Sequence, residues 1–125
     1  MGKRRKIIPA RAIRVTAAAP LLDRDRELVQ VSDLFLQDRS EKCREILEKF
    51  RNKIEQYTWL QVKGSGKGFN IETRHPPPRK WPNTVSPDEV CIRLKASGKA
   101  RVFGFRDGTV LYVVWVDPDH RIDGG

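Results

Sequence analysis

The C-terminal third of the chain alternates apolar and polar residues, which is the pattern of β-strands. Residues 90–95 read Val-Cys-Ile-Arg-Leu-Lys, so we expect a strand there, followed by a turn at Ser97-Gly98. Two further alternating runs, residues 100–106 and 109–116, are separated by Asp107-Gly108. Asp-Gly between two such runs is a strong hairpin signal and indicates a type I′ turn. The segment is therefore predicted to be a three-stranded antiparallel meander.

The predicted turn pairs Arg106 with Thr109 and Gly104 with Leu111. Both faces of the resulting hairpin are largely apolar. We therefore expect a sheet that is central and covered on both sides, or covered on one side and used for binding on the other. Because Gly104 has no side chain, a helix or a ligand backbone can approach the sheet closely there.

A helix is the best interpretation of residues 38–56. Asp38 is the expected N-cap, and Glu41 three residues later completes a capping box. Residues 17–37 fit a short helix or a short strand, and we favour the helix. The apolar residues that recur on one face of helix 38–56 at helical spacing are Cys43, Ile46, Leu47, Phe50 and Ile54.

The predicted fold class is α+β, with a twisted antiparallel sheet packed on one or two helices. Ile13 and Val15 alternate with polar neighbours, which offers an additional N-terminal strand. Residues 23–125 have the usual size of a single domain. Residues 1–22 are interpreted as a basic arm, because they hold six Lys and Arg and no acidic residue.

Two loops separate the helix from the meander. In residues 63–68, Lys-Gly-Ser-Gly-Lys-Gly, the glycines are too close together for a phosphate-binding P-loop, and Gly68 follows Lys67. Residues 74–82 hold consecutive prolines, which favour polyproline geometry. Trp81 in that loop is either a platform that stacks a nucleobase or a side chain that packs the loop onto the core, and packing is the more common role.

The formal net charge of the 125 residues is +9, with 25 Lys and Arg against 16 Asp and Glu. Such a charge favours contact with phosphate polyanions, and a solvated tail is an equally weighted explanation of the arm. An Arg-rich, acid-poor N-terminus also fits an organellar transit peptide. The residues expected to contact nucleic acid are Lys3, Arg4, Arg5, Lys6, Lys67, Arg74, Arg79, Lys80 and Trp81.

Several other classes are unsupported by the sequence. No apolar run approaches the roughly 20 residues of a membrane span, so no membrane partner is expected. Cys43 and Cys91 cannot form a disulfide framework, which favours a cytoplasmic protein. The Cys, His and Asp residues lack zinc-site spacing, and no nucleotide-cofactor motif is present, so we expect neither a metal nor a cofactor.

Four residues are candidates for chemistry. Arg101 and Arg106 lie in predicted strands, where an arginine needs a charged partner. That partner is either a bound phosphate or a nearby carboxylate such as Asp117. His75 and His120 are the only histidines, and histidine is suited to proton transfer near neutral pH. A lone histidine more often has a structural role, so both interpretations stay open.

A helix followed by a basic loop and a final meander resembles small toxins of the RelE/ParE superfamily. The similar stretches are residues 92–94, 100–106 and 110–116, followed by His120-Arg121. The Phe-Gly-Phe-Arg and Trp-Val-Asp-Pro-Asp-His stretches also resemble small bacterial and phage proteins without an assigned activity.

The toxin resemblance implies endoribonucleolytic cleavage of RNA, often ribosome-bound mRNA, without a metal, and a cognate antitoxin as partner. It implies that Arg101 or Arg106 holds the scissile phosphate and that His120 is the acid or base, with His75 as the other histidine candidate. The arm, the Pro-rich loop and the lack of a tyrosine after His120 depart from the family pattern.

The alternative is a non-catalytic accessory protein of phage or plasmid origin that binds nucleic acid or the ribosome. An enzyme needs a histidine close to an arginine in a concave site, whereas a binder does not.

Overall fold

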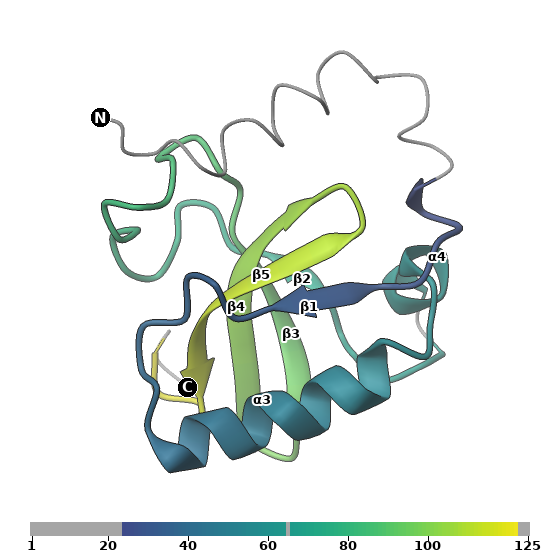
Figure 1. The fold of residues 1–125 in the computed structure, drawn as a ribbon, viewed down its shortest axis with the longest axis horizontal. Helices are drawn as coiled ribbons and strands as arrows, with labels where there is room; N and C mark the ends of the chain where they lie inside the picture. Colours follow the sequence, from purple (N-terminus) through teal and green to yellow (C-terminus); the bar gives the residue numbers. More distant parts are fainter. Residues whose placement is uncertain (1–23, 65, 123–125) are drawn as a thin grey trace.

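The computed structural model describes residues 24–64 and 66–122 and confirms the α+β fold class (Figure 1). Five strands form one sheet in the order β1-β5-β4-β3-β2. The meander β3-β4-β5 is antiparallel as predicted, whereas β1 runs parallel to β5, so the sheet is mixed. The elements are β1 (Gln30–Ser32), α3 (Glu41–Ile54), α4 (Trp59–Lys63), β2 (Glu72–Thr73), β3 (Ile92–Ser97), β4 (Ala100–Asp107) and β5 (Val110–Asp117).

The basic arm at residues 1–22 and the N-terminal strand suggested by Ile13 and Val15 lie outside the described residues. The short helix favoured within residues 17–37 is wrong for residues 28–35, because residues 30–32 form β1. The Gln30 N–H donates to the Thr109 carbonyl (3.0 Å), and the Val31 N–H donates to Oε2 of Glu55 (2.8 Å). These partners, which are distant in sequence, stabilise β1. The strand has only three residues, too few to show the alternation of apolar and polar residues that identifies a strand.

The N-cap of helix α3 lies two residues later than predicted. Ser40 is the cap: its hydroxyl accepts from the Cys43 N–H at 3.4 Å, so the capping box of Asp38 with Glu41 is wrong. Asp38 supports the cap instead, because its Oδ1 accepts from the Ser40 N–H at 2.9 Å. That hydrogen bond lowers the pKa of Asp38 below its ordinary value.

The sheet is covered on both faces. Helix α3 lies against one face (Figure 1). Its Leu47, Phe50 and Ile54 pack with Val102 of β4 and Leu111 of β5 in one continuous core. A second cluster fills the opposite face under the loops that hold Phe35 and Trp81. The first of the two arrangements expected for a two-sided apolar sheet is therefore confirmed. The buried members of the second cluster are Phe35, Trp81, Val85, Cys91, Phe103, Phe105, Val114 and Trp115.

Trp81 packs the Pro-rich loop onto this second face. Its indole lies 5.2 Å from the ring of Trp115 in a stacked arrangement, and only 7% of the residue is exposed. Its Nε1 donates to the Glu89 carbonyl at 3.1 Å. Trp81 is thus placed as a core residue, and the interpretation as an exposed platform for a nucleobase is corrected.

The hairpin between β4 and β5 has a different register from the predicted one. Arg106 pairs with Leu111, so the two loop residues are Gly108 and Thr109 rather than Asp107 and Gly108. Gly108 has φ +67° at the first loop position, where a type II′ turn places glycine. Residues far away in sequence set this register, because the Thr109 carbonyl accepts hydrogen bonds from Nε1 of Trp59 at 2.8 Å and from the β1 backbone.

Gly104 marks a β-bulge in the same hairpin. Gly104 pairs with Val113 and Phe103 pairs with Trp115, which leaves Val114 as the extra residue. A Cβ atom at position 104 would overlap the carbonyl oxygen of Tyr112. The close neighbour at this glycine is therefore the adjacent strand, not the helix or ligand expected from the sequence.

Gly104→Ala is expected to lower the free energy of unfolding by about 1–3 kcal/mol, because strand β5 must shift to make room. Gly66→Ala is the matched control, since no heavy atom lies within 4 Å of its added Cβ, and it should change stability by less than about 0.5 kcal/mol. Urea titrations of both variants measure the difference. Equal stabilities for the two variants would contradict the close strand approach.

Candidate nucleic-acid interface

The structure brings Arg101 and His120 to one end of the sheet and places Arg106 at the other. Arg101 pairs with Asp117, three residues before His120, near the start of β4. Arg106 lies five residues further along β4, about 17 Å away at the usual rise of a strand. His75 is exposed in the Pro-rich loop, and Lys3, Arg4, Arg5 and Lys6 lie outside the described residues.

Arg106 is held by the protein itself. Its Nη2 contacts Oδ1 of Asp25 at 2.5 Å, and its Nε donates to the Gly108 carbonyl at 2.8 Å. The guanidinium also lies 4.1 Å from the centre of the Trp59 ring, a cation–π distance. Arg106 therefore fastens the segment before β1 to the hairpin and to α4. Because Arg106 has these partners and lies at the other end of the sheet, its position does not support a phosphate site shared with His120.

Asp25 is shared by two cations. Lys63 donates to Oδ2 at 2.9 Å, while Arg106 holds Oδ1. The hydrogen bond from Lys63, together with that from Arg106, lowers the pKa of Asp25 despite the opposing effect of partial burial. The carboxylate is thus ionised and paired throughout the neutral range.

Arg101 makes no carboxylate ion pair in the described part of the chain. Its Nη1 donates to the carbonyls of Gly98 (2.8 Å) and Ala100 (3.0 Å), which carry no net charge. Asp117, its cross-strand neighbour, uses Oδ2 to accept from the Ile122 N–H at 2.7 Å. The sequence offered two partners for Arg101, a carboxylate and a bound phosphate. The Asp117 carboxylate does not pair with Arg101, which leaves the guanidinium able to bind a phosphate from solution.

A second cation lies directly beside Arg101. Lys95 of β3 pairs with Arg101, so two positive charges face each other across neighbouring strands. Such like-charge pairs are unfavourable in the absence of an anion. Arg93 is two residues away on the same strand, with its Nη2 at 2.7 Å from Oε1 of Glu72. We name Arg93, Lys95 and Arg101 the basic row.

The basic row lies on the face of the sheet opposite α3. Leu94 and Val102 alternate with the row along their strands and belong to the core against α3. Phe103, two residues from Arg101, belongs to the cluster on the opposite face. The sequence interpretation missed Arg93 and Lys95, although the alternation of residues 90–95 placed both on the polar side of the strand.

A hollow of about 190 Å³ continues the surface beyond Asp117. His120 is not among its lining residues, and the backbone of His120 has φ +60°, a left-handed conformation that is uncommon outside glycine. The lining residues are Asp38, Arg79, Trp115, Val116, Asp117, Pro118, Arg121 and Ile122.

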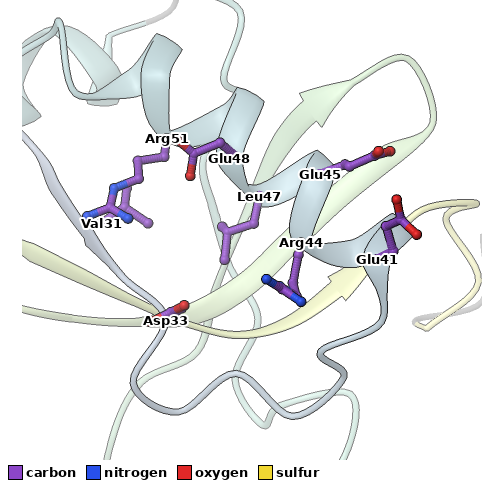
Figure 2. Close-up of a pocket in the computed structure, with 8 residues that line it drawn as sticks. All are labelled: Val31, Asp33, Glu41, Arg44, Glu45, Leu47, Glu48 and Arg51. Carbon is purple, nitrogen blue, oxygen red and sulfur yellow. The ribbon is translucent and has the colours of Figure 1, made fainter.

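A larger hollow of about 560 Å³ lies between α3 and the β1 edge (Figure 2). Four carboxylates line it against two guanidinium groups, so the hollow is net negative and unsuited to a polyanion. Its lining residues are Val31, Asp33, Glu41, Arg44, Glu45, Leu47, Glu48 and Arg51.

Positive charge is concentrated in the second half of the domain. Residues 24–62 hold eight Lys and Arg and eight Asp and Glu, whereas residues 63–122 hold eleven against six. Arg79, Lys80 and Lys67 are exposed, with Nζ of Lys67 at 5.5 Å from the centre of the Tyr57 ring. Arg74 is half-buried, and its backbone N–H donates to the Cys91 carbonyl.

Within residues 24–64 and 66–122, no group of three or more His, Cys, Asp or Glu is placed to hold a metal ion. No helix in this part of the chain has the length and apolar character needed to cross a membrane.

Searches against protein-family models, curated proteins and solved structures found no match to this chain. The toxin resemblance therefore stays an expectation drawn from the sequence.

Asp25→Asn is expected to lower stability at pH 7 by about 1–3 kcal/mol, because it removes charged hydrogen bonds to Lys63 and Arg106. The folded pKa of Asp25 is lowered, so this contribution is present above the ordinary pKa of about 3.9 and is lost as the pH falls through the folded value. The difference in the free energy of unfolding between wild type and variant should accordingly disappear in acid.

Chemical denaturation between pH 7 and pH 2 measures this gap. Asp88→Asn, at an exposed carboxylate, is the control and should have no effect of this size. A gap that stays constant over the pH range would show that the Asp25 charge does not stabilise the fold.

Proposed function

We propose that this protein binds RNA through the basic row and cleaves it as a metal-independent, toxin-like endoribonuclease. The observation that carries the proposal is the pair Lys95 and Arg101, side by side on neighbouring strands and without a carboxylate partner in the described residues. A phosphodiester bound between them relieves their repulsion and receives the guanidinium fork of Arg101.

The proposed reaction needs only protein groups. The 2′-hydroxyl of the RNA attacks the adjacent phosphorus, and the bond to the 5′-oxygen of the next nucleotide breaks. One group takes the proton of the 2′-hydroxyl and another gives a proton to the departing 5′-oxygen. Lys95 and Arg101 stabilise the charge that develops on the phosphate oxygens, and His120 at the same sheet end is the candidate for proton transfer.

The partners follow from the same charge distribution. The arm at residues 1–22 adds salt-sensitive affinity for any RNA, including ribosomal RNA. A cognate antitoxin, as the toxin resemblance implies, would silence the protein by presenting carboxylates to Lys95 and Arg101 in place of phosphate.

A second candidate is an RNA- or ribosome-binding accessory protein without catalysis. One observation favours it: the hollow at this sheet end is lined by Arg79 and Arg121 but by neither His75 nor His120. A binder needs the basic row and no proton-transfer group.

Lys95→Ala and Arg101→Ala are each expected to weaken binding to a single-stranded RNA by about tenfold in 100 mM salt. Each should also reduce the slope of log affinity against log salt by about 0.7, the value for one lost phosphate contact on a single strand. Fluorescence anisotropy measures both quantities. Lys49→Ala, on the exposed side of α3, is the matched control. Unchanged affinity in both row variants would refute the interface.

His120→Asn separates the two candidate functions, because asparagine tolerates the positive φ at this position but transfers no proton. The proposal predicts a loss of cleavage by about 10²–10⁴-fold with RNA affinity retained. Cleavage of a fluorescent RNA and thermal melting are measured together. Wild-type protein that binds RNA tightly but never cleaves it would establish the accessory-protein function instead.

A further inference from the structure

The hollow beyond Asp117 and the basic row are linked through one residue, Asp117. Lys95, Arg101 and Asp117 are consecutive cross-strand neighbours on β3, β4 and β5, and Asp117 also lines the hollow. Two strand spacings, about 10 Å in all, separate Lys95 from Asp117. A nucleotide whose phosphate lies on the row therefore has its base within reach of the hollow.

The hollow has the scale of one nucleobase. Its 190 Å³ would hold roughly six water molecules at the volume of liquid water. Trp115 forms an apolar wall that is kept rigid by its stacking on Trp81. A planar ring can contact this wall.

The polar groups around the hollow combine donors with acceptors. Arg79 and Arg121 are exposed guanidinium groups at its rim. Asp38 and Asp117 supply carboxylates, each with one oxygen bonded to a backbone N–H, from Ser40 and from Ile122. Asp117 is only 3% exposed, so its position is fixed by the surrounding structure.

This set of groups matches guanine better than adenine or uracil. A guanidinium donates two hydrogen bonds to the O6 and N7 acceptors of guanine, the commonest specific base contact of arginine. A carboxylate accepts from the neighbouring N–H groups on the other edge of the same base. Adenine places an amino donor beside N7, which an arginine cannot accept from, and uracil has no amino group.

We propose that the hollow lined by Arg79, Asp117 and Arg121 is a guanine-selective pocket next to the phosphate-binding row. The inference rests on the proposed RNA-binding function and specifies the base that the site selects. In this pocket Arg79 and Arg121 contact the base, a function separate from the phosphate contacts of the basic row.

The test uses three labelled pentaribonucleotides, UUUUU, UUGUU and UUAUU, in anisotropy titrations with the full chain. Wild-type protein should bind UUGUU about tenfold more tightly than UUAUU and UUUUU. Arg79→Ala, Arg121→Ala and Asp38→Asn change groups at the rim. At least one of them should reduce the G-to-A ratio several-fold. Lys49→Ala should leave the ratio unchanged.

Lys95→Ala distinguishes loss of RNA binding from loss of guanine selectivity. It should weaken binding of all three RNAs equally and preserve the G-to-A ratio. If wild-type protein shows no preference for UUGUU, or if the preference survives all three rim variants, the guanine pocket is refuted while RNA binding stands. If Lys95→Ala and Arg101→Ala leave UUUUU binding unchanged, the proposed function itself fails.

Discussion

The pairing of β4 with β5 across Gly104 is the contact on which the rest of the structure depends. The Tyr112 carbonyl occupies the space of a side chain at Gly104, and the extra residue Val114 lets the two strands turn aliphatic groups to one face and aromatic groups to the other. Helix α3 covers the first face, and the loop of Trp81 covers the second. The same pairing sets Arg101 beside Asp117 at the rim, so the core geometry also positions the basic row.

The elements with a clear local period were predictable from the sequence, and those fixed by distant partners were not. The meander and the amphipathic helix follow from alternation and helical spacing, and both are present. The hairpin register was wrong because the Thr109 carbonyl is engaged by Trp59 and by β1, which a turn motif does not reveal. Strand β1 was missed for the same reason, since β5 and the Glu55 carboxylate stabilise it from outside its own sequence.

The candidate site was predictable only in part. Of the two arginines that the toxin resemblance offers as the phosphate ligand, Arg101 lies at the sheet end of His120, and Arg106 lies at the other end in a network with Asp25 and Trp59. No local pattern distinguishes these two arginines, because both lie on the same strand and the groups that hold Arg106, Asp25 and Trp59, are far from it in sequence. Lys95 was overlooked because its importance comes from the register that sets it opposite Arg101.

The central claim is that RNA lies along the partly exposed side chains of the basic row, beside the loops that cover the rest of the same sheet face. Photocrosslinking with RNA that contains 4-thiouridine, followed by mass spectrometry of the peptides, tests it most directly. The account predicts crosslinks within residues 91–101 and 115–122, which hold the row and the neighbouring hollow. Crosslinks concentrated on α3, residues 41–54, beside the acidic hollow of Figure 2, would contradict it.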